Sequence, residues 1–257
     1  MGCLEGRIAL ITAAGSGMGR AGAVRFAQEG AHVWVTDAVA EAAEETVEQI
    51  RAAGGAATAR RLDVTDLPAI RSILDEIDRE HGVLHVLYNH AGTPGAAGLG
   101  ASLDEWDQTV DVNMKSAYYA TSYAVDLLRR AEGTGSVIFT ASVSALCGSP
   151  YSPLYSMAKG GITAMVKALA LALAPDGIRC NAICPSSVAT PMLRVFLDRN
   201  DEGLTDEQME EFVKRTVPLG RAARPEEIAA VALFLACDES SFVTGVPLPV
   251  DGGFTAR

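Results

Sequence analysis

Short apolar runs alternate with longer stretches of helical periodicity along all 257 residues. In the helical stretches apolar side chains recur on one face, as Ile70, Ile73 and Ile77 do ahead of Gly82. Strands that alternate with helices form parallel sheets joined by right-handed crossovers, with helices on both faces. The sequence therefore predicts an α/β fold, a doubly wound (Rossmann) sheet of about seven strands. The expected strands are residues 7–12, 32–36, 57–62, 84–89, 136–141, 179–184 and 246–250.

Length and charge narrow the class of protein further. At 49% hydrophobic, the chain can bury the core of one Rossmann-fold domain spanning residues 1–257, and no repeat or linker divides it. Its 21 Lys+Arg against 32 Asp+Glu give a net charge of -11, which repels nucleic-acid phosphates and anionic lipids. The longest uncharged runs, such as residues 168–175 and 228–237, are shorter than a membrane span. We expect neither a nucleic-acid nor a membrane partner.

The cysteines indicate the compartment. Their number is odd, they are thinly spread, and no CxxC pair or Cys/His cluster has the spacing of a zinc site. The N-terminus lacks the pattern of a secretory signal. We therefore expect reduced thiols, no metal and a cytoplasmic protein. The five residues are Cys3, Cys147, Cys180, Cys184 and Cys237.

A small-residue turn, residues 12–20, follows the first expected strand and leads into a helix. Backbone N–H groups at a helix start can bind a pyrophosphate, and Gly17 and Gly19 permit close approach. Arg20 stands where G-x-G-x-x-G has its last glycine, so the turn alone equally fits an ordinary strand-to-helix connection. Asp37 ends the second strand, where a carboxylate can bind both adenosine ribose hydroxyls and repel a 2′-phosphate. Together they favour NAD(H) over NADP(H).

A second constellation lies later in the chain. Tyr155 and Lys159 are one helical turn apart, so both side chains project from the same face. Ser142 follows an expected strand and thus lies at the same sheet edge as the glycine turn. Asn113 stands within an expected helix, where asparagine lowers helix propensity and needs a reason. An ordinary tyrosine, with a pKa near ~10, is a poor base at neutral pH, and a neighbouring lysine would favour its phenolate.

In order along nearly the whole chain, these motifs resemble the short-chain dehydrogenase/reductase family, in its short single-domain branch. The residues that carry the resemblance are 12–19, Asp63-Val64, Asn89-His90-Ala91-Gly92, Asn113, Ser142, Tyr155-x-x-x-Lys159, Pro185 with Thr190, and Asp251-Gly252-Gly253.

The resemblance implies a role for each matching residue. Tyr155 would be the general acid/base, Lys159 would hold the nicotinamide ribose, and Ser142 would bond the substrate oxygen. Asn113 would anchor a water linking Lys159 to solvent. A homotetramer is also implied, with the helices of residues 113–131 and 155–174 pairing between subunits. The cofactor contacts implied are Gly15, Ser16, Gly17, Met18, Gly19, Asp37, Asp63, Val64, Asn89, Ala91, Gly92, Tyr155, Lys159, Pro185, Val188 and Thr190.

Three residues depart from the family pattern. Ala13 replaces the first glycine of the turn, which adds strain if the turn needs a positive φ. His90 replaces the usual second asparagine, and a histidine packed at a strand end is the favoured interpretation over a catalytic base. Ser186 stands where the family usually has glycine. Because none belongs to the catalytic set, they bear on cofactor affinity rather than on the chemistry.

Residues 186–215 mix apolar and charged side chains in a pattern that suits an amphipathic substrate lid. Leu146 and Tyr151, after Ser142, and Met192 and Phe196, within the lid, are candidate pocket residues, although ordinary packing explains them equally well. Their chemistry favours a mostly apolar alcohol or ketone.

Three functions remain open. The preferred one is an NAD(H)-dependent oxidoreductase that interconverts a secondary alcohol and a ketone. The second is a 3-oxoacyl thioester reductase that uses NADPH, against which Asp37 argues. The third is a non-catalytic nucleotide-sensing scaffold, against which the intact Asn113, Ser142, Tyr155 and Lys159 argue.

Overall fold

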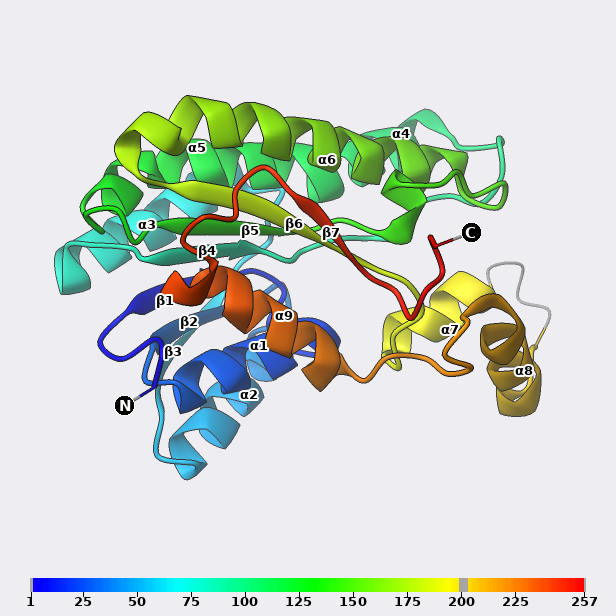
Figure 1. Cartoon of the computed structure of the whole chain (residues 1–257), viewed down its shortest axis with the longest axis horizontal. Helices are drawn as coiled ribbons and strands as arrows, with labels where there is room; N and C mark the ends of the chain where they lie inside the picture. Colours follow the sequence, from blue (N-terminus) through cyan, green and yellow to red (C-terminus); the bar gives the residue numbers. More distant parts are fainter. Residues whose placement is uncertain (1, 199–202, 257) are drawn as a thin grey trace.

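A computed structural model of the chain describes residues 2–198 and 203–256, and its strands form one parallel sheet (Figure 1). The strand order is β3-β2-β1-β4-β5-β6-β7, so the order reverses between β1 and β4. This confirms the predicted doubly wound sheet. The strands are β1 (Ile8–Ile11), β2 (His32–Asp37), β3 (Ala56–Arg61), β4 (Val86–Asn89), β5 (Ser136–Thr140), β6 (Arg179–Pro185) and β7 (Pro247–Val250).

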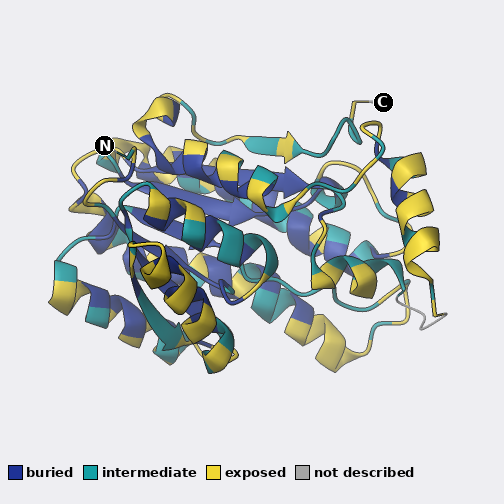
Figure 2. Ribbon diagram, turned by 90° about the horizontal axis from the view of Figure 1, so that it is seen from below, coloured by how far each residue is buried: buried dark blue, intermediate teal, exposed yellow. Residues whose placement is uncertain are grey.

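Helices cover both faces of the sheet (Figure 1). One layer contains α3 (Leu67–His81), α4 (Leu103–Val110), α5 (Ser116–Arg129) and α6 (Pro153–Leu173). The other contains α1 (Gly17–Gln28), α2 (Ala40–Ala52) and α9 (Pro225–Ala236). Two further helices, α7 (Pro191–Leu197) and α8 (Asp206–Thr216), lie beyond the sheet, and Figure 2 shows how much more exposed α8 is than the sheet.

The helix α3 illustrates how local sequence sets an element. Asp66 accepts a hydrogen bond from the backbone N–H of Ala69, with Pro68 in the first turn. Gly82 ends the helix at φ +70°, a left-handed conformation that glycine adopts without strain. Its apolar face is buried against the sheet, as the spacing predicted.

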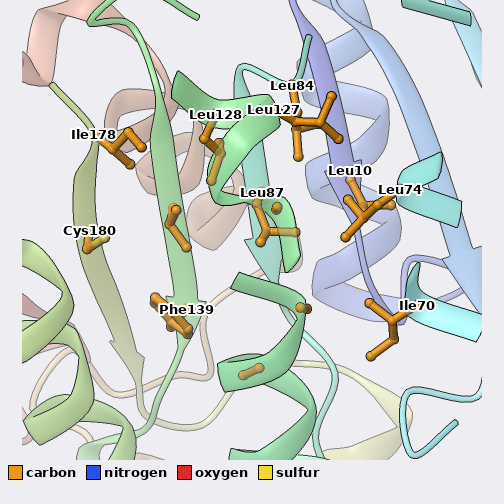
Figure 3. Close-up of a cluster of buried hydrophobic side chains, with 14 of the residues drawn as sticks. Leu10, Ile70, Leu74, Leu84, Leu87, Leu127, Leu128, Phe139, Ile178 and Cys180 are labelled. Carbon is orange, nitrogen blue, oxygen red and sulfur yellow. The ribbon is translucent and has the colours of Figure 1, made fainter. Parts of the chain in front are cut away.

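Each strand contributes side chains to two cores, one on either face of the sheet. In the first core, Leu10, Leu87 and Phe139 of three neighbouring strands meet Leu74 and Leu128 of the helices (Figure 3). In the second, Phe26, Val35, Ile50, Ile138 and Ile183 are all buried. Since both faces are covered, the strand backbones are fixed, and the side chains just beyond their carboxyl ends are held in place.

The helix α6, with the short turn after it, is the one helix of residues 2–198 and 203–256 long and apolar enough to cross a membrane by length and composition. Lys159 and Lys167 interrupt its uncharged runs, which is why the sequence showed only short ones. In the structure Ala158, Ile162 and Val166 are buried, and α6 packs on the sheet beside α5 (Figure 1). The apolar residues on this face of α6 therefore belong to the core.

The expectation that all thiols are reduced is wrong for one pair. The structure joins Cys3 to Cys237 in a disulfide, with Cα atoms 5.9 Å apart and 234 residues between them in sequence. Cys180 and Cys184 are free and buried within β6, and Cys147 is free and exposed. The pairing was invisible in the sequence because only the fold brings the N-terminal segment next to the end of α9.

Candidate active site

A cavity of about 1490 Å³ runs along the carboxyl edge of the sheet. Asp37, at the end of β2, and Ser142, just after β5, both line it, although β1 and β4 separate their strands. The cavity thus lies across the point where strand order reverses, the position at which doubly wound sheets bind ligands. Tyr155 and Lys159 line it too, so the glycine turn, Asp37 and three of the four catalytic candidates share one site, whereas Asn113 does not line it.

The turn after β1 leaves room only for backbone. A Cβ added to Gly19 would lie 2.2 Å from the Ala13 carbonyl oxygen and 2.7 Å from Cδ2 of His90. Gly17 has φ +51°, a conformation that favours glycine. With Ser16 extended at the helix start, the N–H groups that begin α1 lie at the cavity. This is a suitable cradle for an anionic group such as a pyrophosphate.

Asp37 is held by the turn it faces. Its Oδ2 accepts a hydrogen bond from the Gly15 N–H at 3.0 Å, and its Oδ1 accepts one from the Val39 N–H at 3.0 Å. Arg20 holds the next peptide group, because its Nε donates to the Gly15 carbonyl oxygen at 2.9 Å. Glu45 binds the same guanidinium at 2.8 Å. Arg20, at the position of the last glycine of G-x-G-x-x-G, therefore stabilises the turn.

Ala13 has φ +54°, so the turn does require a positive φ at the position where the family has glycine. An L-residue in the left-handed region costs about 1–2 kcal/mol. The sequence left open whether this turn needs a positive φ, and the structure shows that it does.

The catalytic candidates lie on the first turns of α6 and just after β5. Tyr155 and Lys159 are 7% and 2% exposed. The Lys159 ammonium donates to the Thr140 carbonyl oxygen at 2.8 Å and lies 5.7 Å from the centre of the Tyr155 ring. The Ser142 hydroxyl accepts a hydrogen bond from the Ser144 N–H at 3.1 Å, which leaves its own proton to donate to an oxygen in the cavity.

Burial lowers the pKa of Lys159 to about 8, because the ammonium loses its hydration. The nearby Cys184 thiol has the opposite, smaller effect. The charge beside Tyr155 therefore responds to pH just above neutrality.

Asn113 belongs to a short π-helical segment, Asp111–Lys115, between α4 and α5. Its Nδ2 donates to the carbonyl oxygens of Thr109 at 2.9 Å and Thr93 at 3.1 Å, and its Oδ1 accepts from the Thr93 N–H. A Cβ added to Gly92 would lie 3.0 Å from this Oδ1 and 3.1 Å from the Lys159 ammonium. The Asn113 amide thus pairs with a backbone carbonyl of the preceding turn, and its oxygen and the Lys159 ammonium both lie close to the same side of Gly92.

His90 is tied into the floor of the cavity. Its Nδ1 is 2.8 Å from the Thr140 hydroxyl, which in turn donates to the Tyr88 hydroxyl at 3.1 Å. Burial, and then the charge of Lys159, lower the pKa of His90 to about 4. The ring is neutral at physiological pH, which suits a packed histidine rather than a general base.

Several expected cofactor contacts lie away from this cavity. Val64, Asn89 and Ala91 line a separate small hollow, and the Asp63 carboxylate accepts hydrogen bonds from Thr65 in its own turn. The Thr12 hydroxyl, to which sequence reasoning gave no role of its own, accepts from the N–H groups of both His90 and Ala91 at 3.0 Å. The cavity is lined by other candidates, namely Ser16, Gly17, Met18, Gly92, Pro185, Val188 and Thr190.

The substrate candidates divide in the same way. Tyr151, Met192 and Phe196 line the cavity, and the Phe196 ring centre is 4.9 Å from that of Tyr155. Leu146 does not line it, whereas its neighbour Cys147 does. The expected lid, residues 186–215, includes α7 and most of α8, while its residues 199–202 lie outside the described residues. Sequence reasoning missed Glu207, Glu211 and Arg215, which also line the cavity, although their spacing of four residues is a visible signal.

Comparison with known proteins adds independent evidence. A family model described as enoyl-(acyl carrier protein) reductase matches residues 12–255. Meso-2,3-butanediol dehydrogenase of Serratia marcescens is 38% identical, over 98% of this chain and 96% of that protein. Cyclohexanol dehydrogenase of an Acinetobacter strain is 36% identical over the same shares. The 3-oxoacyl-[acyl-carrier-protein] reductase of Thermotoga maritima is 36% identical, over 97% of this chain and 98% of that protein.

Solved structures are similar over the same extent. Levodione reductase superposes with a TM-score of 0.93 and 30% identity, covering 99% of each chain. A structure described as a putative NAD(P)-dependent gluconate 5-dehydrogenase of Beutenbergia cavernae, with NADP at low occupancy, has a TM-score of 0.89 and 31% identity, covering 99% of this chain and 98% of that one.

Proposed function

The chain belongs to the short-chain dehydrogenase/reductase family of oxidoreductases, and from that premise we propose that it interconverts a secondary alcohol and a ketone with NAD(H), using Tyr155 as general acid/base. The observation that carries the proposal is that Ser142, Tyr155 and Lys159 line the same cavity as Asp37 and the glycine turn. A hydride acceptor beside the alcohol carbon and a proton acceptor beside its hydroxyl oxygen can therefore be brought together in one cavity.

The residues present fit a dinucleotide. Gly17 has a positive φ, and a Cβ on Gly19 would collide with the Ala13 carbonyl, so these glycines allow the turn to close and the start of α1 would bind the pyrophosphate. The Asp37 carboxylate, oriented by Gly15 and Val39, would accept the ribose hydroxyls and repel a 2′-phosphate. When bound, NAD supplies the ring that takes the hydride from the alcohol carbon.

The proton would be handled by the chain's own side chains. The Ser142 hydroxyl would donate to the substrate oxygen and hold it near Tyr155, whose phenolate would accept the hydroxyl proton. A charged Lys159, 5.7 Å from the tyrosine ring centre, would stabilise that phenolate. Asn113 would hold a water between Lys159 and solvent, for which its place beside Gly92 is suitable.

We further propose that residues 1–257 act as one domain in a homotetramer. A cytoplasmic location stays part of the proposal, although the Cys3–Cys237 disulfide removes the argument from reduced thiols. The helices α5 and α6 lie side by side on one face of the sheet (Figure 1). Their outer surfaces carry large apolar side chains, with Tyr118 49%, Met157 41% and Leu171 81% exposed. Pairing these helices between subunits would remove that apolar surface from water.

A second candidate, a 3-oxoacyl thioester reductase that uses NADPH, is favoured by the Thermotoga relative's name and by the bound NADP of the Beutenbergia structure. Asp37 argues against it, because its carboxylate would face the 2′-phosphate. The name of the Acinetobacter relative favours a small cyclic alcohol instead.

Titration of the protein's fluorescence with NADH and with NADPH, followed by turnover of secondary alcohols, tests these candidates. We expect tighter binding of NADH and oxidation of cyclohexanol. A preference for NADPH together with reduction of a 3-oxoacyl thioester would support the second candidate. Binding of NADH without turnover of any alcohol or ketone would indicate a nucleotide-sensing scaffold.

A further inference from the structure

The substrate half of the cavity carries an unbalanced set of charges. Apart from Asp37 and Lys159, the charged side chains among the described lining residues are Asp198, Glu207, Glu211 and Arg215. Three of these are acidic and one is basic, so the described residues of this half carry an excess of negative charge. The chain as a whole has a net charge of -11, which adds to the same field.

Glu207, Glu211 and Arg215 lie four residues apart, on one face of α8. All three are exposed. Neither glutamate has an ion-pair partner among residues 2–198 and 203–256. By contrast, Glu210 does not line the cavity and is 2.9 Å from Lys214, and Arg194 is paired with Asp206. Lys214 is thus paired with Glu210, and its charge acts on Glu211 only as a smaller effect without an ion pair.

Near the catalytic candidates the walls are uncharged. Met192 and Phe196 from α7 and Tyr151 from the loop before α6 are apolar or aromatic. Among the described residues that line this region the one cation is Lys159, whose ammonium is bound to the Thr140 carbonyl oxygen. His90 is neutral. An anionic group carried into this region would lose its hydration without gaining a free counter-ion, which is strongly unfavourable.

We infer that this site selects uncharged secondary alcohols and ketones and discriminates against substrates bearing a carboxylate, with Glu207 and Glu211 as specificity-determining residues at the rim. The inference rests on the proposed function and narrows its substrate class. The apolar walls impose the larger part of the discrimination, through desolvation. The rim adds a smaller part by repelling an anion over roughly one Debye length, about 10 Å at 0.1 M salt.

A pair of probes that differ mainly in charge tests the inference. We would compare 4-hydroxycyclohexanecarboxamide with 4-hydroxycyclohexanecarboxylate, two molecules of nearly equal shape, and use cyclohexanol as the reference substrate. The expected kcat/KM is at least about tenfold higher for the amide at low ionic strength, since one unpartnered charge costs at least that much. Equal rates for the two, or a preference for the carboxylate, would overturn the inference.

Two neighbouring charge reversals isolate the rim. Glu211→Lys should raise the kcat/KM of the carboxylate about threefold relative to the amide, and added salt should reduce this gain. Glu210→Lys makes the same change of charge one residue away, on a side chain that does not line the cavity, and should shift the ratio less. An unchanged ratio in Glu211→Lys, or the same shift in both variants, would show that the rim has no part in selection.

Arg215, the one described cation among the charged residues of this half, allows a result that would contradict the inference. If its guanidinium bound the carboxylate of a substrate, Arg215→Gln would weaken turnover of the carboxylate more than that of the amide, and that result would contradict the inference. If the natural chain turned over none of cyclohexanol, the amide and the carboxylate, the proposed function itself would be contradicted. The two failures are therefore distinct.

Discussion

The cofactor half and the substrate half of the cavity are built from different parts of the fold. The cofactor half is formed by strand ends and backbone, with the backbone N–H of Gly15 bound to Asp37 and its carbonyl oxygen bound to Arg20. The substrate half is formed by α7 and α8, which lie beyond the sheet and are largely exposed (Figure 2). The first half is fixed by buried strands, whereas the second can vary its side chains at little cost to the fold. A chain built in this way can keep the reaction of its family and still have its own substrate range.

Tyr155→Phe gives the most severe test of this division, because the Tyr155 ring lies beside Lys159 and beside Phe196 of α7. The change removes the proton acceptor and almost no volume, so we expect kcat to fall at least about a thousandfold. The dissociation constant of NADH should stay within about twofold, since the cradle and Asp37 are unchanged. Stopped-flow turnover and fluorescence titration give the two numbers. Substantial residual activity would refute the role given to Tyr155.

His90 tests how rigid the cofactor half is. Its folded pKa of about 4 lies below the unfolded value of 6.5, so between these pH values the unfolded chain binds the extra proton. The contribution of His90 to the free energy of unfolding, about 3 kcal/mol, is therefore fully present above pH 6.5 and is lost as the pH falls towards 4. Urea unfolding at pH 7 and pH 4 should show a smaller loss for His90→Asn than for the natural chain. His32 and His85, whose pKa values are also lowered by burial, act in both proteins alike.

Asp37→Ala probes selectivity within the cofactor half alone. Removing the carboxylate should relax the preference for NADH over NADPH by about tenfold, the worth of roughly 1.4 kcal/mol of charge repulsion. The ratio of kcat/KM values for one alcohol with the two cofactors measures this. Glu44→Ala, an exposed acid on α2 that does not line the cavity, is the matched control. The same ratio in both variants would make Asp37 an ordinary surface acid.

The same division explains what the sequence could reveal. The strand positions, Asp37 and the Tyr155–Lys159 pair were predictable because period and spacing act locally. The disulfide of Cys3 with Cys237 and the bonds of His90 to Thr140 were not, because they join residues distant in the chain. Local spacing did place Glu207 and Glu211 on one helix face, but only the position of α8 showed that this face meets the cavity.

The smallest expected effect concerns Ala13, at φ +54° in the turn that cradles the cofactor. Ala13→Gly relieves a left-handed alanine but adds freedom to the unfolded chain, and these two effects oppose each other. The net result should be a stabilisation of about 0.5–1 kcal/mol in urea unfolding. Ala53→Gly makes the same exchange at φ -87° on an exposed helix end, where there is no such strain to relieve, so it should destabilise. If both changes lowered stability equally, the turn would hold its alanine without strain, and the cofactor half would be less constrained than its geometry indicates.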